Sequence, residues 1–182
     1  MSIITLKNVR LSFPQIWSAK AFNEGQTPKF SANFLLDKEG DKDQIDAIKK
    51  AIKQAATVHF NGEIPKGLKT FLNDGEEKAY DGYDGAMYVS TSGKNRPTII
   101  DRDRTPLVEE DGKPYAGCYV NAAISLWIMD NKWGKKINAN LVGIQFVKDG
   151  SSFGSAAVAA ETIFDDISSE QAADAADDDF LS

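Results

Sequence analysis

Alternating apolar and polar residues recur along most of this 182-residue chain, and a period of two indicates a fold built mainly from β-strands. The first such stretch, residues 3–13, changes parity in its middle. Leu6 and Val9 are three positions apart, so they cannot point to the same side of one regular strand. This change predicts a β-bulge or a local twist near Lys7 and Asn8.

Later parts of the chain repeat the strand pattern. Further strands are expected at residues 30–36, 87–91, 97–101, 119–129 and 137–147. The composition of residues 92–95, Ser-Gly-Lys-Asn, is typical of a turn and predicts a hairpin between the strands that flank it. Residues 14–28, which contain Pro14 and Pro28, are expected to form a long connection. About six or seven strands in total indicate a β-barrel or a sandwich.

One segment has the period of an amphipathic helix instead. Between residues 45 and 55, apolar side chains recur at spacings of three and four. Asp41 can cap the start of this helix, and Gln44 can reach back to complete a capping box. We expect the helix to end before Asn61 and Gly62.

Residues that carry catalytic or metal chemistry are scarce. The single cysteine, Cys118, excludes an intramolecular disulfide, and together with the single histidine, His59, it leaves too few ligands for an ordinary zinc site. The sequence contains no glycine-rich phosphate-binding motif, no run of about 18 apolar residues that could span a membrane, and no signal-peptide pattern at its start. We therefore expect a cytosolic protein that uses no cofactor or metal and makes no membrane contact.

The end of the chain has an unusual charge. Residues 161–182 contain eight acids and no Lys or Arg, so a tail of −8 follows a body of +2. This division predicts a polyanionic ligand that the tail can imitate, although some acidic ends only keep a protein soluble. The final Asp177-Asp178-Asp179-Phe180-Leu181 combines charge with an apolar anchor, which predicts a docking peptide for a protein partner. We expect a folded domain over residues 1–154 and a flexible acidic tail over residues 155–182.

Binding of a single nucleic-acid strand requires cations along a groove and flat rings on which bases stack. Three parts of the sequence offer both. The candidate DNA-binding residues are Trp17, Lys20, Phe22 and Lys29 in the first part, Tyr80, Tyr83, Lys94, Arg96, Arg102 and Arg104 in the second, and Lys132, Trp133, Lys135 and Lys136 in the third. In the structural alternative, these rings pack inside the fold and the cations pair with nearby acids or form a solvated hairpin tip. Trp127 lies on a strand that is apolar on both faces and is expected in the core.

Two other classes of protein remain open from the residues alone. Asp101, Asp103, Glu109 and Glu110 lie close together in the sequence and could hold the metal ion of a nuclease. The two arginines interleaved with the first pair would neutralise it, so a surface loop is favoured and no enzymatic activity is expected. A virion or assembly protein would use a similar β-barrel for protein contacts.

Three segments resemble a known family. They read Arg-Pro-Thr-Ile-Ile-Asp at 96–101, Tyr-Ala-Gly-Cys-Tyr-Val-Asn-Ala at 115–122, and Asn-Ala-Asn-Leu-Val-Gly-Ile-Gln-Phe-Val-Lys-Asp-Gly at 138–150. These segments are similar to the single-stranded DNA-binding proteins of tailed bacteriophages, the group that includes the phage T7 protein. The resemblance implies a mainly β fold: an OB-fold-like five-stranded barrel with extra strands and one amphipathic helix.

The resemblance also implies a function. Members of the group bind single-stranded DNA without strong sequence preference during phage replication, recombination or repair, here in the cytoplasm of an infected bacterial host. Their acidic tail recruits replication proteins such as polymerase or helicase, and it covers the DNA groove when DNA is absent. A homodimer is also possible, because a tail that reaches its own groove could reach the groove of a neighbour.

Overall fold

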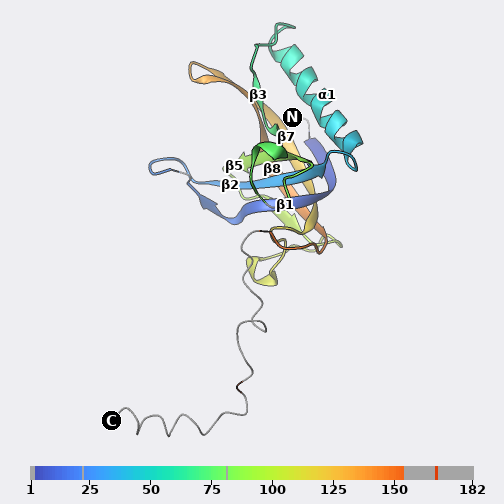
Figure 1. The fold of residues 1–182 in the computed structure, drawn as a ribbon. Coiled ribbons are helices and arrows are strands. Elements are labelled where there is room, and N and C mark those ends of the chain that lie inside the picture. Colours follow the sequence, from blue (N-terminus) through green and yellow to red (C-terminus); the bar gives the residue numbers. More distant parts are fainter. Residues whose placement is uncertain (1–2, 22, 81, 154–166, 168–182) are drawn as a thin grey trace, which may run out of the picture.

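The computed structural model describes residues 3–21, 23–80, 82–153 and 167, and Figure 1 shows how its elements are arranged. In chain order these elements are β1 (Ile3–Lys20), β2 (Lys29–Asp37), α1 (Lys42–His59), β3 (Lys69–Thr70), β4 (Leu72–Asp74), the 3-10 helix η1 (Gly75–Glu77), β5 (Ala86–Gly93), β6 (Thr98–Ile100), the 3-10 helix η2 (Glu109–Asp111), β7 (Tyr119–Asn131) and β8 (Gly134–Lys148). No helix in the described part of the chain is long and apolar enough to cross a membrane.

Five of the strands close into a barrel. β1 pairs with β2 and β7, β2 continues to β5, and β7 continues to β8, all of them antiparallel. A parallel contact between Ser92 of β5 and Asn140 of β8 joins the two ends of this sheet. The short strands β3, β4 and β6 are added at the margins. The expected OB-fold-like five-stranded barrel, with extra strands and one helix, is therefore confirmed.

The barrel interior is apolar because alternate residues of each strand point inward. Phe34 of β2, Val89 of β5, Ile124 of β7 and Ile137 of β8 are all fully buried there. Helix α1 packs against the same core through Ile45 and Ile48, among others. Burial of one such aliphatic side chain contributes about 1.5–3 kcal/mol to the stability of the fold. The apolar side chains predicted between residues 45 and 55 therefore hold the helix on the barrel.

The predicted bulge in β1 is confirmed. The pairing of β1 with β7 shifts register between Leu6 and Val9, and Asn8 adopts a positive φ of 54°. Gln44 of α1 occupies the gap, since its side chain accepts a hydrogen bond from Lys7 N (2.8 Å) and donates one to Lys7 O (2.9 Å). Gln44 also reaches back as predicted, since its Nε2 donates to Asp41 Oδ1 (3.2 Å), but no capping box forms, because the Asp41 carboxylate accepts from Asp37 N and from no N–H of the helix.

Two other predictions are also wrong. Residues 14–20 are not part of a connection but continue β1, because a second bulge, with Phe13 at a φ of 46°, lets the strand pass through Pro14. Residues 92–95 do not form a hairpin turn. β5 already pairs with β2, β4 and β8, so β6 pairs with β8 in parallel instead.

Gly75 provides a test of the packing around the loop that follows β4. An added Cβ at this position would lie 2.6 Å from the backbone oxygen of Ala86, and it would also overlap the backbone oxygen of Tyr83. We expect Gly75→Ala to lower the free energy of unfolding by roughly 1–3 kcal/mol, because backbone atoms cannot rotate away from the new methyl group. Urea denaturation measures this loss. Gly40→Ala is the control, since its Cβ would meet only ordinary contacts at 3.5 Å or more; equal losses in the two variants would contradict the packing.

Cys118 provides a second test. Its side chain is fully buried, and burial raises the pKa of the thiol to about 11. At pH 8 the thiol of the folded protein is therefore both protonated and inaccessible, and we expect no reaction with a thiol reagent within minutes. The same reagent should react completely in denaturant. Rapid reaction of the folded protein would show that the barrel opens near Cys118.

Candidate nucleic-acid interface

Two hollows adjoin on one face of the barrel. We call the first the tryptophan hollow; it has a volume of about 690 Å³ and is lined by Lys29, Lys94, Arg96 and Trp127 among others. We call the second the tyrosine hollow; it has a volume of about 680 Å³ and is lined by Phe13, Lys20, Lys78, Tyr80 and Lys136 among others. Ser92 lines both hollows, so they form one continuous surface.

A row of polar residues crosses the floor of this surface. It contains one residue from each barrel strand: Gln15 of β1, Ser31 of β2, Ser92 of β5, Asn140 of β8 and Ser125 of β7. Each is directly paired with the next across the sheet. Since neighbouring strands lie about 4.8 Å apart, this polar row spans roughly 19 Å. Its four half-buried members offer hydrogen-bond donors and acceptors without negative charge, whereas Ser125 is buried.

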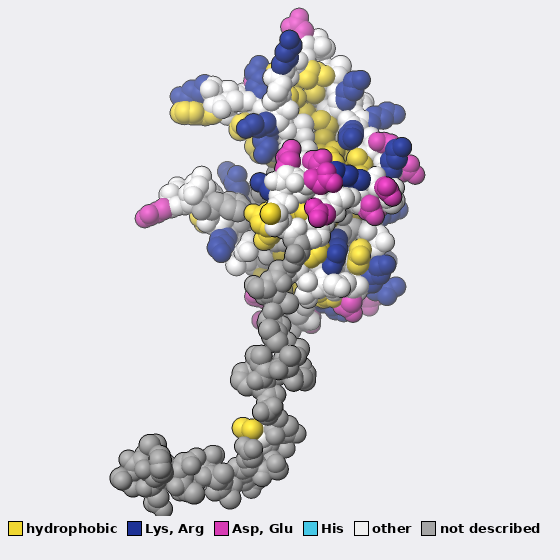
Figure 2. Space-filling model, in the orientation of Figure 1, with side chains coloured by type: hydrophobic (Ala, Val, Ile, Leu, Met, Phe, Trp, Pro, Cys, Tyr) yellow, Lys and Arg dark blue, Asp and Glu magenta, His cyan; other side chains and the backbone are white. Residues whose placement is uncertain are grey.

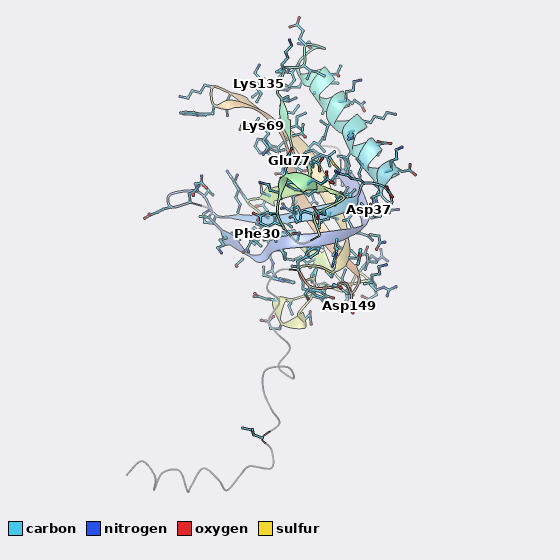
Figure 3. The ribbon with its side chains drawn as sticks, in the orientation of Figure 1. Phe30, Asp37, Lys69, Glu77, Lys135 and Asp149 are labelled. Atoms are coloured by element: carbon cyan, nitrogen blue, oxygen red, sulfur yellow. The ribbon has the colours of Figure 1, made fainter. Side chains whose placement is uncertain are left out.

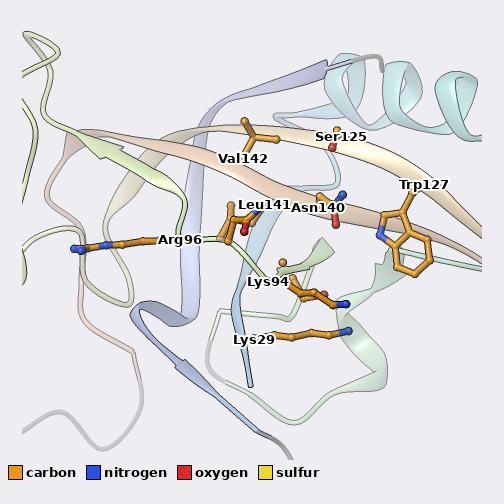
Figure 4. A pocket seen from close by; sticks show the side chains of 11 residues that line it. Lys29, Lys94, Arg96, Ser125, Trp127, Asn140, Leu141 and Val142 are labelled. Atoms are coloured by element: carbon orange, nitrogen blue, oxygen red, sulfur yellow. The ribbon is translucent and has the colours of Figure 1, made fainter. Parts of the chain in front are cut away.

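Cations surround the polar row. Lys29, Lys94 and Arg96 line the tryptophan hollow, and Lys20, Lys78 and Lys136 line the tyrosine hollow. Among the described residues, no Asp or Glu lines either hollow and none of these six cations forms an ion pair. In Figure 4, the side chains of Lys29 and Lys94 run beside each other. Because no described acid neutralises these six positive charges, the surface favours an anionic ligand.

Aromatic rings are exposed in both hollows. Trp127 is 40% exposed, whereas the sequence predicted a core position. In the tyrosine hollow, Phe13 and Tyr80 are 52% and 50% exposed, and their ring centroids are 4.8 Å apart in an edge-to-face arrangement. Such rings present the flat surfaces on which nucleobases stack.

Tyr83 lies beneath this pair and is fully buried. Its ring centroid is 5.3 Å from that of Tyr80. Its hydroxyl group shares a hydrogen bond with Ser12 Oγ (2.9 Å) and accepts one from Asn33 Nδ2 (3.1 Å). In this structure Tyr83 therefore supports the exposed rings and presents no surface of its own to a base.

Asn138 contributes a free donor to the tyrosine hollow. Its side chain lines the hollow, and its Nδ2 atom is buried without a hydrogen-bond partner in the described part of the chain. An unpaired buried donor is costly, and a ligand oxygen would satisfy it.

Two hairpin arms flank the tyrosine hollow (Figures 1 and 2). One is the β1–β2 arm, which contributes Lys20, and the other is the β7–β8 arm, which contributes Lys136. Figure 3 labels Phe30 on the first and Lys135 on the second. The arms form opposite walls of the surface.

The tip of the β7–β8 arm lies beyond both hollows. There Trp133 is 82% exposed, and Lys132 Nζ lies 4.9 Å from the centre of its ring. Lys135 faces the helix instead, with Nζ 3.8 Å from an Asp130 oxygen and 5.3 Å from the Phe60 ring centre. Of the third predicted group, only Lys136 lines a hollow.

The other predicted residues are divided between the hollows and the remaining surface. Lys20, Lys29, Tyr80, Lys94 and Arg96 line the hollows. Trp17 packs against the core, with the Arg96 guanidinium 5.3 Å from its ring centre, as in the structural alternative. Phe22 and the tail residues Asp177, Asp178, Asp179, Phe180 and Leu181 lie outside the described residues.

Arg102 and Arg104 lie on an exposed loop after β6, outside both hollows. The carboxylates of Asp101 and Asp103 in this loop already bind nearby groups of the protein. A hydrogen bond from Arg102 N and the ion pair with Lys113 (3.1 Å) lower the pKa of Asp101, and hydrogen bonds from Thr105 lower that of Asp103. Within the described residues, no group of three or more His, Cys, Asp or Glu side chains is placed to hold a metal ion.

Among the cations and exposed rings of the hollows, three were missed from the sequence, namely Phe13, Lys78 and Trp127, and no residue of the polar row was predicted. Trp127 shares its parity with Ser125, which was the available signal that it points outward. Phe13 could not be recognised in the same way, because its exposure depends on the second bulge.

Comparisons with known proteins agree with this architecture. Residues 1–181 match the family described as Enterobacter phage Enc34, ssDNA-binding protein. Protein p50 of Acyrthosiphon pisum secondary endosymbiont phage 1 is 41% identical over 174 residues, covering 91% of this chain and 94% of that protein.

Solved structures show the same barrel. The single-stranded DNA-binding protein from bacteriophage Enc34 in complex with ssDNA superimposes with a TM-score of 0.75 at 28% identity, covering 84% of this chain and 89% of that chain. The bacteriophage T7 protein gp2.5 superimposes with a TM-score of 0.58 at 13% identity, covering 91% of this chain and 96% of that chain, which shows a shared fold. The resemblance noted from three short segments thus extends over the whole sequence, and the chain belongs to the Enterobacter phage Enc34 single-stranded DNA-binding protein family.

Proposed function

We propose that the chain binds single-stranded DNA, without strong sequence preference, across the tryptophan and tyrosine hollows. The observation that carries this proposal is the polar row, which six cations flank and no described carboxylate interrupts. The structure of the bacteriophage Enc34 protein, which is 28% identical, was solved in complex with ssDNA, and this supports the proposal that the chain binds single-stranded DNA.

Each class of side chain has a separate part in the proposed binding. The lysines and Arg96 contact phosphates and release counterions, which makes the affinity depend on salt. Trp127, Tyr80 and Phe13 stack on bases, at about 1–3 kcal/mol per base regardless of its identity. A duplex hides its base faces, so exposed rings favour a single strand.

The β7–β8 arm extends the proposed surface. Trp133 and Lys132 at its tip place a ring and a charge beyond the tyrosine hollow. We propose that they contact the strand where it leaves the barrel. Arg102 and Arg104 are not part of the proposed surface, because their loop after β6 lies outside both hollows.

The acidic tail, residues 155–182, is the second part of the proposal. Its eight acids would compete with DNA for the cations, and displacement by DNA would free it to recruit replication proteins such as polymerase or helicase. Phe153, the last described residue before the tail, packs against the buried cluster that contains Tyr83. On this view the protein acts in phage replication, recombination or repair in the host cytoplasm, and a tail shared between two copies would form a dimer.

The cations of the tryptophan hollow provide the first test. We expect Lys29→Gln/Lys94→Gln to weaken oligo-dT binding and to reduce the salt slope of log K by roughly 1.4, because two phosphate contacts are lost. Fluorescence titration at several salt concentrations measures both quantities. Lys49→Gln/Lys50→Gln removes the same charge from exposed positions on α1 and serves as the matched control. An equal effect of the two double variants would refute the assigned surface.

The tail provides the second test. Deletion of residues 161–182 should tighten binding to oligo-dT, most strongly at low salt, and should abolish contact with the protein partner. A control that keeps the length of the tail but replaces its acids by Asn and Gln separates charge from tethering, and it should bind as tightly as the deletion. Unchanged affinity in both variants would exclude competition by the tail.

A further inference from the structure

The chain segment after β8, residues 149–153, folds back onto the barrel. Phe153 is held there by contacts with Ala116 and Arg10, which we call the Phe153 clasp. Asp149, labelled in Figure 3, marks the start of this return. Phe153 N donates to Ala116 O (3.3 Å), and the Arg10 guanidinium lies 4.0 Å from the centre of the Phe153 ring. Arg10 also donates to the backbone oxygens of Gly117 and Ser151. Arg10 therefore fixes both the ring and the backbone that carries it.

The Phe153 ring also contacts the turn that follows Tyr80. Gly82 has a φ of 82°, and a Cβ added there would overlap the ring, so only glycine permits the approach. The same ring packs against the buried cluster of Leu35, Tyr83, Ala86 and Tyr88.

This turn leads directly to the tyrosine hollow. Tyr83 N donates to Tyr80 O (3.2 Å), and the Tyr83 ring lies between Tyr88 and Tyr80, 5.3 Å from each. A continuous series of contacts thus runs from Phe153 through Gly82 and Tyr83 to the exposed ring of Tyr80.

We propose that Phe153 is a positioning residue for strand binding, which holds Gly82 and Tyr83 so that the Tyr80 ring can stack on a base. This inference rests on the proposed function, because it requires Tyr80 to meet the strand. It has a consequence for regulation. A partner protein that binds the segment beyond Phe153 and loosens the clasp lowers the affinity for the strand. Because coupling between two sites is reciprocal, a bound strand in turn strengthens the clasp. This route is independent of the charge of the tail.

A double-mutant cycle on the full-length chain tests the proposal. We expect Tyr80→Ala and Phe153→Ala each to lower the affinity for oligo-dT by roughly tenfold, with an unchanged salt slope, because stacking is lost and the phosphate contacts remain. The double variant should bind about as tightly as Tyr80→Ala alone, since Phe153 acts through Tyr80. Fluorescence titration measures the affinities, and thermal unfolding verifies that each variant is folded. Additive losses would overturn the proposal, because a general structural defect does not depend on Tyr80.

Two further variants sharpen the result. Phe153→Leu keeps apolar contact with Gly82 and should restore most of the affinity. Arg10→Met removes the cation above the ring, lies outside both hollows, and should also lose its effect in the Tyr80→Ala background. This second cycle decides the matter if Phe153→Ala does not fold.

The outcomes separate this inference from the proposed function. If Tyr80→Ala weakens binding but Phe153→Ala and Arg10→Met do not, the inference is wrong and the proposed function stands. If Tyr80→Ala binds normally while Lys29→Gln/Lys94→Gln binds weakly, the inference is again wrong, because Tyr80 does not meet the strand. If the unaltered chain does not bind oligo-dT at any salt concentration, the proposed function itself fails.

Discussion

The parallel contact between Ser92 of β5 and Asn140 of β8 determines the geometry of the whole surface. Four antiparallel pairings alone would give an open sheet with two unpaired edges, and open edges invite pairing with other chains. The contact joins these edges at one point and aligns the five residues of the polar row, while β4 covers part of the β5 edge and β3 and β6 cover parts of the β8 edge. The contact that makes the barrel is therefore also the middle of the proposed binding surface.

Charge is distributed around this row in a way that the overall composition conceals. The chain has a net charge of −6, yet the residues that line the two hollows include six cations and, among those described, no carboxylate. Acids within the folded part pair elsewhere, as Asp74 and Glu76 do with Lys38. Local charge, rather than the net charge of the protein, decides what the barrel face attracts.

Local features were predictable from the sequence, whereas long-range ones were not. The bulge at Asn8, the limits of α1 and most strand positions follow from periodicity within a few residues. The partner of β6 does not, because it depends on which edges of β5 are already occupied by distant strands. The site divides in the same way: several lysines were recognised from their sequence neighbours, but the exposure of Trp127 depends on what covers its face of β7. Tyr83 was misjudged for the same reason, since a loop residue can be anchored in a cluster formed by other elements.

The burial of Cys118 has a practical consequence. Because the only native thiol is buried inside the barrel, a cysteine introduced at an exposed position such as Trp133 would be the single reactive thiol on the folded molecule. A dye could then be attached to the tip of the β7–β8 arm without first removing the native residue. The structure thus lends itself to an optical reporter that signals the arrival and departure of a strand in real time.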